Sequence, residues 1–260
     1  MIQDCYKRRI PLLGINHKMT LQSMVNLAQS HQKICKYDLA ETLYTDCLER
    51  QQQVYGEDSE HVITTISKMA LLYDVMNKHD YSEPLYVITH RKYITLLSEK
   101  HNKTLSALHK LAVYYYNQTH YITAEPLFSK CVELRTAVLG VDHMDTLSSM
   151  CYLAQTYTYH HKYIEAESLF TTCITKMKLN LGDTHKVTIN AKFHHANMYK
   201  QQGNFHQAKT LYNECYHNRI SVLRGTDSEL IRHAQAVNVL HSAEKESHIA
   251  AVERSDCVVS

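Results

Sequence analysis

The sequence contains no tryptophan, only three prolines and only six glycines among its 260 residues. So few residues that break regular structure argue against long flexible linkers and favour a chain that is helical over most of its length. The sequence also lacks a run of 18 apolar residues, and residues 1–14 lack the apolar segment of a secretory signal. We therefore expect a cytoplasmic protein without a membrane-spanning helix.

An excess of charge and the motifs of common catalytic sites are missing as well. The 28 Lys and Arg residues nearly balance the 26 Asp and Glu residues, which leaves a net charge of +2 with His neutral. Such a balance does not require nucleic acid or an anionic surface as a partner. There is no glycine-rich phosphate loop, no G-x-S-x-G and no H-E-x-x-H. We expect no catalytic residues, no cofactor, no small-molecule substrate and no nucleic-acid partner.

What the sequence does have is a repeat of 42 residues. The segment TLSALHKLAVYYY, which begins at Thr104, returns as TLSSMCYLAQTYT at Thr146. A fixed period of this size is typical of repeat proteins, in which each unit buries its apolar face only by stacking on its neighbours. One alanine recurs in all five units that the period defines: Ala28, Ala70, Ala112, Ala154 and Ala196.

Each repeat has the apolar spacing of two helices. In the first half, Leu105, Leu108 and Ala112 are separated by three or four residues, and Ala124, Leu127 and Cys131 have the same spacing in the second half. Glycine, which accepts the left-handed backbone that ends a helix, marks the repeat ends. It stands at positions 14, 56, 140 and 182, and Ser98 occupies the equivalent position of the second repeat.

These features predict the following organisation. The five repeats span residues 20–61, 62–103, 104–145, 146–187 and 188–229. Residues 1–19 are expected to hold a remnant helix of a preceding repeat. Residues 230–260 are expected to form a capping helix and a polar C-terminal tail, because a terminal segment has no neighbour on its outer face.

The pattern resembles a known family of repeats. Its length, the run Ala124-Glu125-Pro126-Leu127-Phe128 and the G-x-x-H-x-x-T linkers at 140–146 and 182–188 are similar to the tetratricopeptide repeat of the kinesin light chain type. The resemblance implies an all-α fold, an α-solenoid of about five helix-turn-helix repeats that forms a right-handed superhelix. It also implies a non-catalytic scaffold that binds a peptide segment of a partner protein on its concave face.

The concave wall of such a solenoid is built from the first helix of each repeat. Amide side chains there can bond to the backbone of an extended peptide, and aromatic side chains can supply apolar contact. An ordinary solvated face is the alternative interpretation. The candidate groove residues are Gln29, His109, Tyr116, Asn117, Gln155, Tyr159, Asn190, Phe193 and Asn197.

We interpret the recurring cysteines and histidines as structural residues and not as metal ligands. Five of the eight cysteines share one repeat position, Cys5, Cys47, Cys131, Cys173 and Cys215, and are expected to be small buried residues. No C-x-x-C pair is present, so we expect no metal site. The histidines of the linkers, His17, His101, His143 and His185, are expected to be structural.

The last four residues, Cys257-Val258-Val259-Ser260, fit a C-a-a-X prenylation motif. Cys257 also lies 42 residues after Cys215, so it is alternatively the cysteine of a decayed sixth repeat. A membrane contact is expected only if Cys257 is prenylated. Two alternatives to a peptide-binding scaffold therefore stay open: the regulatory array of a larger multidomain protein, and a prenylated membrane-associated adaptor.

Overall fold

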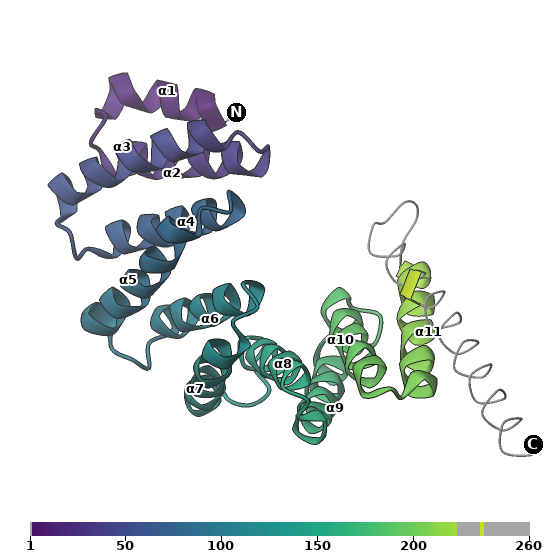
Figure 1. Cartoon of the computed structure of the whole chain (residues 1–260). Coiled ribbons are helices and arrows are strands. Elements are labelled where there is room, and N and C mark those ends of the chain that lie inside the picture. Colours follow the sequence, from purple (N-terminus) through teal and green to yellow (C-terminus); the bar gives the residue numbers. More distant parts are fainter. Residues whose placement is uncertain (1, 223–234, 237–260) are drawn as a thin grey trace, which may run out of the picture. The chain divides into compact units, whose positions relative to one another are not determined.

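The computed structural model describes residues 2–222 together with 235 and 236, and this part of the chain is built from α-helices without a strand (Figure 1). The helices are α1 (Ile2–Leu13), α2 (Lys18–Lys33), α3 (Tyr37–Tyr55), α4 (Glu60–Val75), α5 (His79–Leu97), α6 (Asn102–Asn117), α7 (Tyr121–Leu139), α8 (Met144–Tyr159), α9 (Tyr163–Leu181), α10 (Lys186–Gln202) and α11 (Phe205–Val222). The predicted all-α repeat fold is confirmed. The expected capping segment 230–260 and Cys257 lie outside the described residues, apart from positions 235 and 236.

The helices follow the 42-residue period. The even-numbered helices begin at residues 18, 60, 102, 144 and 186, and the next helices begin at 37, 79, 121, 163 and 205. The chain divides into two compact units, residues 1–120 and 121–260, and the boundary falls inside the predicted repeat 104–145. We describe each unit by itself.

Small and large side chains alternate in the core of each unit. The five recurring alanines are completely buried, which lets helices approach closely. The aromatic position of each second helix fills the space beside them: Tyr44, Phe128, Phe170 and Tyr212 are at most 1% exposed, and Tyr86 is 4% exposed. This core explains why the alanine and the aromatic residue recur together in the sequence.

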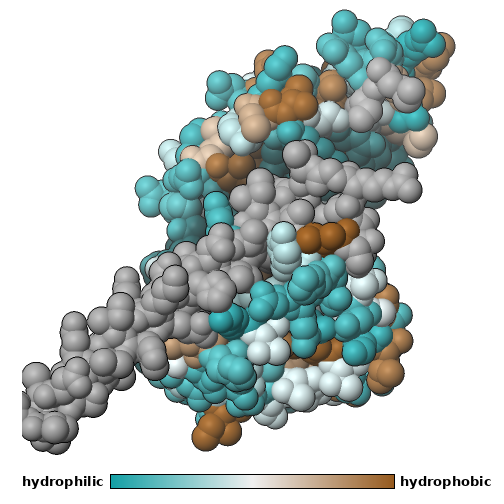
Figure 2. Space-filling view, turned by 90° about the vertical axis from the view of Figure 1, so that its right-hand side faces the viewer, coloured by the Kyte–Doolittle hydropathy of each residue, from teal (hydrophilic) through white to brown (hydrophobic). Residues whose placement is uncertain are grey.

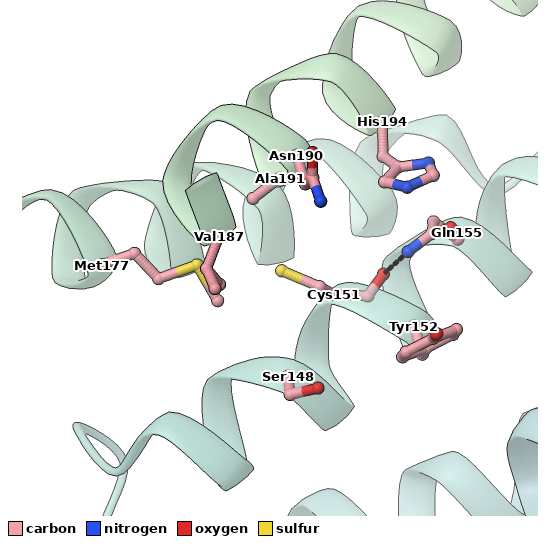
Figure 3. Close-up of a pocket in the computed structure, with 9 residues that line it drawn as sticks. All are labelled: Ser148, Cys151, Tyr152, Gln155, Met177, Val187, Asn190, Ala191 and His194. Atoms are coloured by element: carbon pink, nitrogen blue, oxygen red, sulfur yellow. Dashed lines mark hydrogen bonds between the residues drawn. The ribbon is translucent and has the colours of Figure 1, made fainter. Parts of the chain in front are cut away.

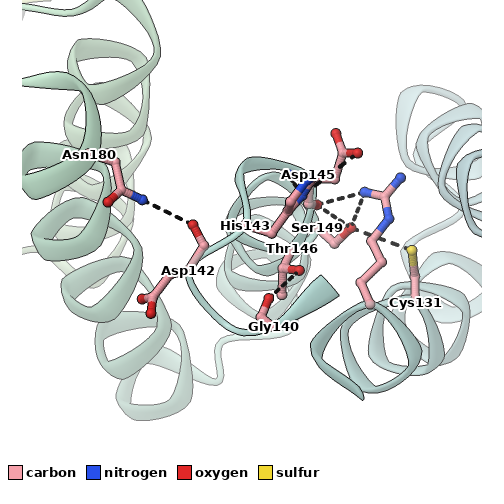
Figure 4. Close-up of polar contacts among 9 residues, drawn as sticks. Cys131, Gly140, Asp142, His143, Asp145, Thr146, Ser149 and Asn180 are labelled. Carbon is pink, nitrogen blue, oxygen red and sulfur yellow. Dashed lines mark hydrogen bonds and ion pairs between the residues drawn. The ribbon is translucent and has the colours of Figure 1, made fainter. Parts of the chain in front are cut away.

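The linker motif G-x-x-H-x-x-T caps the helix that follows it. In α6, α8 and α10 the histidine is the N-cap residue, and its Nδ1 accepts a hydrogen bond from the backbone N–H two residues later. The threonine donates its hydroxyl to the carbonyl of the residue that ends the previous helix, as Thr146 does to Gly140 at 2.8 Å (Figure 4). The linker histidines, including His17 before α2, therefore have a structural role.

The repeated cysteine is buried in four of its five positions. Cys47, Cys131, Cys173 and Cys215 are completely buried, and the thiols of Cys47, Cys173 and Cys215 donate to a backbone carbonyl of the preceding helix at 3.5–3.6 Å. The expectation for Cys5 was wrong, because this residue is exposed.

Tyrosine and glutamate link successive repeats. Tyr73 on α4 donates its hydroxyl to Glu41 on α3 at 3.0 Å, and Tyr199 on α10 donates to Glu167 on α9 at 2.5 Å. One repeat after Tyr73, the equivalent bond joins the hydroxyl of Tyr115 on α6 to Glu83 on α5 at 2.9 Å. Burial, together with the bonded carboxylate, raises the pKa of Tyr73 to about 12, so the hydroxyl stays a donor. This contact is not among the features predicted from the sequence.

Candidate functional site

A groove lies between α8 and α10, the first helices of two successive repeats in the second unit. Two adjoining pockets of about 190 and 270 Å³ form it, and both are lined by Gln155 and His194. The remaining lining residues of the first pocket are Ser148, Cys151, Tyr152, Met177, Val187, Asn190 and Ala191 (Figure 3). The second pocket is completed by Thr158, Tyr159, Asn197, Lys200 and Gln201.

The repeat period itself places these polar side chains opposite one another. Position 148 on α8 corresponds to 190 on α10, and 152, 155 and 159 correspond to 194, 197 and 201. Spacings of four, three and four residues put these positions along one face of each helix. Two parallel rows of polar and aromatic side chains therefore face the groove. The rows are Ser148, Tyr152, Gln155 and Tyr159 on α8, and Asn190, His194, Asn197 and Gln201 on α10.

The amides of the groove differ in what they already bind. Gln155 donates its Nε2 to the carbonyl of Cys151 at 3.2 Å (Figure 3). Asn197 accepts a hydrogen bond from the hydroxyl of Tyr212 at its Oδ1, and this bond does not use its NH₂ group. The half-buried side chain of Asn190 makes no hydrogen bond to another described residue. Asn190 and the NH₂ group of Asn197 therefore have hydrogen-bonding capacity for a ligand.

One end of the groove is apolar. Met177, Val187 and Ala191 line the first pocket beside the thiol of Cys151. The hydrogen bond between the thiols of Cys151 and Cys173, followed by burial, raises the pKa of Cys151 well above its ordinary value. The thiol is therefore protonated at neutral pH and is not a nucleophile. This end of the groove suits an uncharged side chain and not covalent chemistry.

The structure brings four of the nine predicted groove residues together, namely Gln155, Tyr159, Asn190 and Asn197. Phe193 lines neither pocket, because its ring packs against Tyr212 with the ring centroids 5.2 Å apart. The other four are in the first unit. Gln29 lies on α2, where it accepts a hydrogen bond from Lys68, and His109, Tyr116 and Asn117 lie on α6.

Ten residues that line the groove were not among the nine candidates, and Cys151, Met177 and His194 are three of them. Cys151 and His194 lie on the first helices of their repeats. His194 is the repeat equivalent of Tyr152, so a comparison of equivalent positions could have identified these two residues together. Met177 comes from the second helix α9, whose side chains the concave-wall argument did not consider. In the described part of the chain, no three His, Cys, Asp or Glu side chains are placed to hold a metal ion.

Some apolar side chains are exposed on the surface. Ile122, Ile164 and Leu179 in the second unit are 80–85% exposed. The face in Figure 2 is mostly hydrophilic, with hydrophobic side chains in small separate patches, as is normal for a protein surface. Within the residues that the structure describes, no helix has the length and apolar character needed to cross a lipid bilayer.

Two family profiles match the sequence, and both are described as tetratricopeptide repeat. The first covers residues 4–86 and 103–179, and the second covers residues 189–216. Together they include all of α8 and the part of α10 from residue 189 onward. No curated protein matches the sequence significantly.

Solved structures of repeat proteins share the fold. The kinesin light chain nearly identical TPR-like repeats of Podosopora anserina match with a TM-score of 0.68 and 19% identity, over 79% of this chain and 97% of that one. BtubC (BKLC) from P. vanneervenii matches with a TM-score of 0.71 and 19% identity, over 87% and 92%. YrrB, described as a TPR protein with an unusual peptide-binding site, has a TM-score of 0.51 and 13% identity, over 88% and 97%. The resemblance to kinesin-light-chain-type repeats is confirmed at the level of the fold.

Proposed function

The chain belongs to the tetratricopeptide repeat family, and on that basis we propose that it is a non-catalytic scaffold that binds an extended peptide segment of a partner protein between α8 and α10. Proteins with this fold serve as protein-interaction scaffolds. The position of the groove and the form of the ligand are the specific part of the proposal.

One observation carries the proposal: two amides with spare hydrogen-bonding groups, Asn190 and Asn197, lie seven residues apart on the groove side of α10. An asparagine side chain offers two N–H donors and a carbonyl acceptor, which match the alternating groups of a peptide backbone. Seven residues of helix span about 10 Å, and an extended peptide covers that distance in about three residues. The two amides can therefore hold one short stretch of extended backbone.

The apolar end of the groove supports the same ligand. A pocket of about 190 Å³ with Met177, Val187 and Ala191 in its wall suits one uncharged side chain of the peptide. Backbone bonds would supply affinity for any sequence, and the apolar pocket would supply selectivity. The peptide-binding site named for YrrB is a property of that protein, and it illustrates that the fold can serve this purpose.

The experiment begins with peptides selected from a displayed random library on the full chain, followed by affinity measurements on variants. Asn190→Ala removes the unbonded amide. Asn197→Asp removes the NH₂ donor but keeps the oxygen that accepts from Tyr212. Asn213→Ala on α11 is the matched control, because Asn213 lines neither pocket. We expect each groove variant to weaken binding at least about tenfold, the order of a lost hydrogen bond in a desolvated site. Peptides that bind all three variants as tightly as the wild type would contradict the proposal.

A further inference from the structure

Three sulfur-bearing side chains meet at the apolar end of the groove. Cys151 on α8 and both Cys173 and Met177 on α9 belong to one core cluster. The thiols of Cys151 and Cys173 are hydrogen-bonded to each other. Figure 3 shows the sulfur of Met177 and the thiol of Cys151 directed toward one another in the pocket that both residues line. Sulfur atoms from two helices therefore lie together in the second unit.

The helical hairpin of a single repeat sets this arrangement. Cys173 and Met177 are four residues apart on α9, so they lie on the same face of the helix. The thiol of Cys173 donates to the carbonyl of Leu147 on α8 at 3.6 Å, which ties that face to the helix that carries Cys151. The three side chains are held by packing within one hairpin and do not depend on the relation between the two units.

The combination occurs in one repeat only. The repeat position of Cys173 holds cysteine in three of the other four repeats, but the positions of Cys151 and Met177 hold no sulfur in any of them. The equivalents of Cys151 are Val25, Ser67, His109 and Phe193, and the equivalents of Met177 are Gln51, Tyr93, Arg135 and Arg219. Packing of the repeat therefore does not require sulfur at these two positions.

The set of donor atoms points to a soft metal ion. Thiolate and thioether sulfur select Cu(I), which is satisfied by two or three such ligands. Structural zinc takes four ligands from Cys, His, Asp and Glu, and the described part of the chain groups no three of these residues around one point. An iron–sulfur cluster needs four cysteines, and this cluster has two. Of these metal centres, Cu(I) is the one that two thiols and one thioether fit.

A metal ion has a path to the sulfur atoms. Cys151 is 7% exposed and lines the pocket of about 190 Å³ together with Met177, whereas Cys173 is completely buried behind them. Val187 and Ala191 complete this part of the pocket wall with apolar groups. An apolar wall offers no oxygen ligand, so it favours Cu(I) over Cu(II), which prefers nitrogen and oxygen donors.

We propose that Cys151, Cys173 and Met177 form a binding site for one Cu(I) ion. The ion would take the place of the thiol–thiol hydrogen bond and coordinate the three sulfur atoms. Thiol protons would leave to solvent as the copper–sulfur bonds form, and copper would stay in the Cu(I) state. The inference does not rest on peptide binding, because none of the three residues supplies an amide to the proposed peptide.

The test is a titration of the full chain with Cu(I), in a phosphine reductant and against a coloured Cu(I) chelator. The chelator removes copper from single cysteines such as the exposed Cys5 and Cys35. We expect one ion per chain to be retained. Cys151→Ala and Cys173→Ala should each weaken the affinity at least about a hundredfold, and Met177→Leu at least about tenfold, because losing a ligand costs no less than losing an outer-shell partner.

Two variants serve as matched controls. Cys215→Ala removes the repeat equivalent of Cys173, whose thiol donates to the carbonyl of Ile189 in the same way. Met198→Leu removes a completely buried methionine of another core cluster. Both should bind copper as the wild type does, and circular dichroism establishes that every variant is folded.

X-ray absorption spectroscopy of the copper-loaded wild type gives a measurement that needs no variant. We expect sulfur as the only neighbour of copper, with three sulfur atoms bound. Nitrogen or oxygen ligands in the spectrum would overturn the inference. Copper retention by Cys151→Ala and Cys173→Ala equal to that of the wild type would overturn it as well, as would complete loss of copper from the wild type to the chelator. The proposed peptide site would stand in each case, since it is tested at Asn190 and Asn197.

Discussion

Arg135 on α7 donates a hydrogen bond to the hydroxyl of Ser149 on α8 at 2.8 Å, and a second one to the carbonyl of Asp145 at 2.6 Å (Figure 4). Arg135 is 3% exposed, so the bonds hold a buried cation between two repeats. Three repeats earlier, Arg9 binds Ser23 at 2.5 Å in the same way. The equivalent pair in the next repeat is apolar, because Met177 and Ala191 stand at these positions.

A polar pair, Arg135 and Ser149, and an apolar pair, Met177 and Ala191, occupy the same two repeat positions. We therefore predict that the effects of mutating Arg135 and Ser149 on the free energy of unfolding are not additive. Ser149→Ala should lower the free energy of unfolding by about 1.5–3 kcal/mol, because a buried guanidinium loses an acceptor. Arg135→Met together with Ser149→Ala recreates the Met177 and Ala191 pair, and should return the stability to within about 1 kcal/mol of the wild type. Urea unfolding of the four proteins measures this. Additive losses in the double variant would contradict the interpretation.

Ser98 carries backbone strain that four equivalent residues avoid. Its φ is 96° and its ψ is 162°, a region that is nearly restricted to glycine, and Gly14, Gly56, Gly140 and Gly182 have φ of 82–90° at this position. We expect Ser98→Gly to stabilise the chain by about 1 kcal/mol, since relief of strain exceeds the added entropy of the unfolded chain. Gly56→Ser should destabilise it by a similar amount. Thermal unfolding of both variants tests the prediction, and a loss of stability in Ser98→Gly would refute it.

His195 makes stability depend on pH. It is 7% exposed at a position where the other repeats have Leu or Met, and its ring stacks on Phe170 and Tyr199. Burial lowers the pKa of His195 from 6.5 to about 4, against the opposing effect of Glu167. The unfolded chain therefore binds a proton more tightly than the folded chain. The contribution of neutral His195 to the free energy of unfolding is therefore fully present above pH 6.5 and is lost as the pH falls towards 4.

The comparison with His195→Leu isolates this contribution. At pH 7.5 the two proteins should have similar free energies of unfolding. At pH 5 the wild type should be less stable than His195→Leu by about 2 kcal/mol, from a difference of about 2.5 in pKa between the two states. His206→Leu, at an exposed position on α11, is the control and should not change the pH dependence. A constant difference between wild type and His195→Leu from pH 7.5 to 5 would contradict the prediction.

Two tyrosines at one repeat position should respond in opposite ways to loss of the hydroxyl. Tyr44 is completely buried and its hydroxyl has no hydrogen-bond partner among the residues that the structure describes, whereas the hydroxyl of Tyr212 donates to Asn197. Phe128 and Phe170 occupy the equivalent position in two other repeats. Tyr44→Phe should therefore stabilise the chain by about 1 kcal/mol, and Tyr212→Phe should destabilise it by about the same amount. Denaturant unfolding gives both values, and the same sign for both would rule out this explanation.

The sequence predicted those features of the fold that recur at a fixed period. Ala28 and its four equivalents are buried as expected, because a small residue at a close helix crossing has no substitute. The linker histidines are structural for an equally local reason, since each caps the helix that it precedes. The outcome at Cys5 shows the limit of a periodic argument. Burial depends on a neighbouring helix, and equivalence of position does not supply one.

Other features depend on side-chain geometry that the period does not reveal. The turn inside each repeat has a positive φ, at Cys35, Asn77, Thr119, His161 and Gly203, but only the last of these residues is a glycine. The sequence therefore gives no consistent sign of the left-handed turn. Phe193 lies at a predicted groove position, yet its ring packs against Tyr212. The direction of that side chain is set by tertiary packing and not by helical spacing.

The most direct test of the account is an NMR titration of the full chain with a library-selected peptide, observed at the side-chain amides of asparagine and glutamine. We predict that the NH₂ signals of Asn190 and Asn197 shift with the binding curve of the peptide, and that the signal of Asn213 does not. Saturable binding that leaves Asn190 and Asn197 unshifted would place the ligand elsewhere and contradict a groove between α8 and α10.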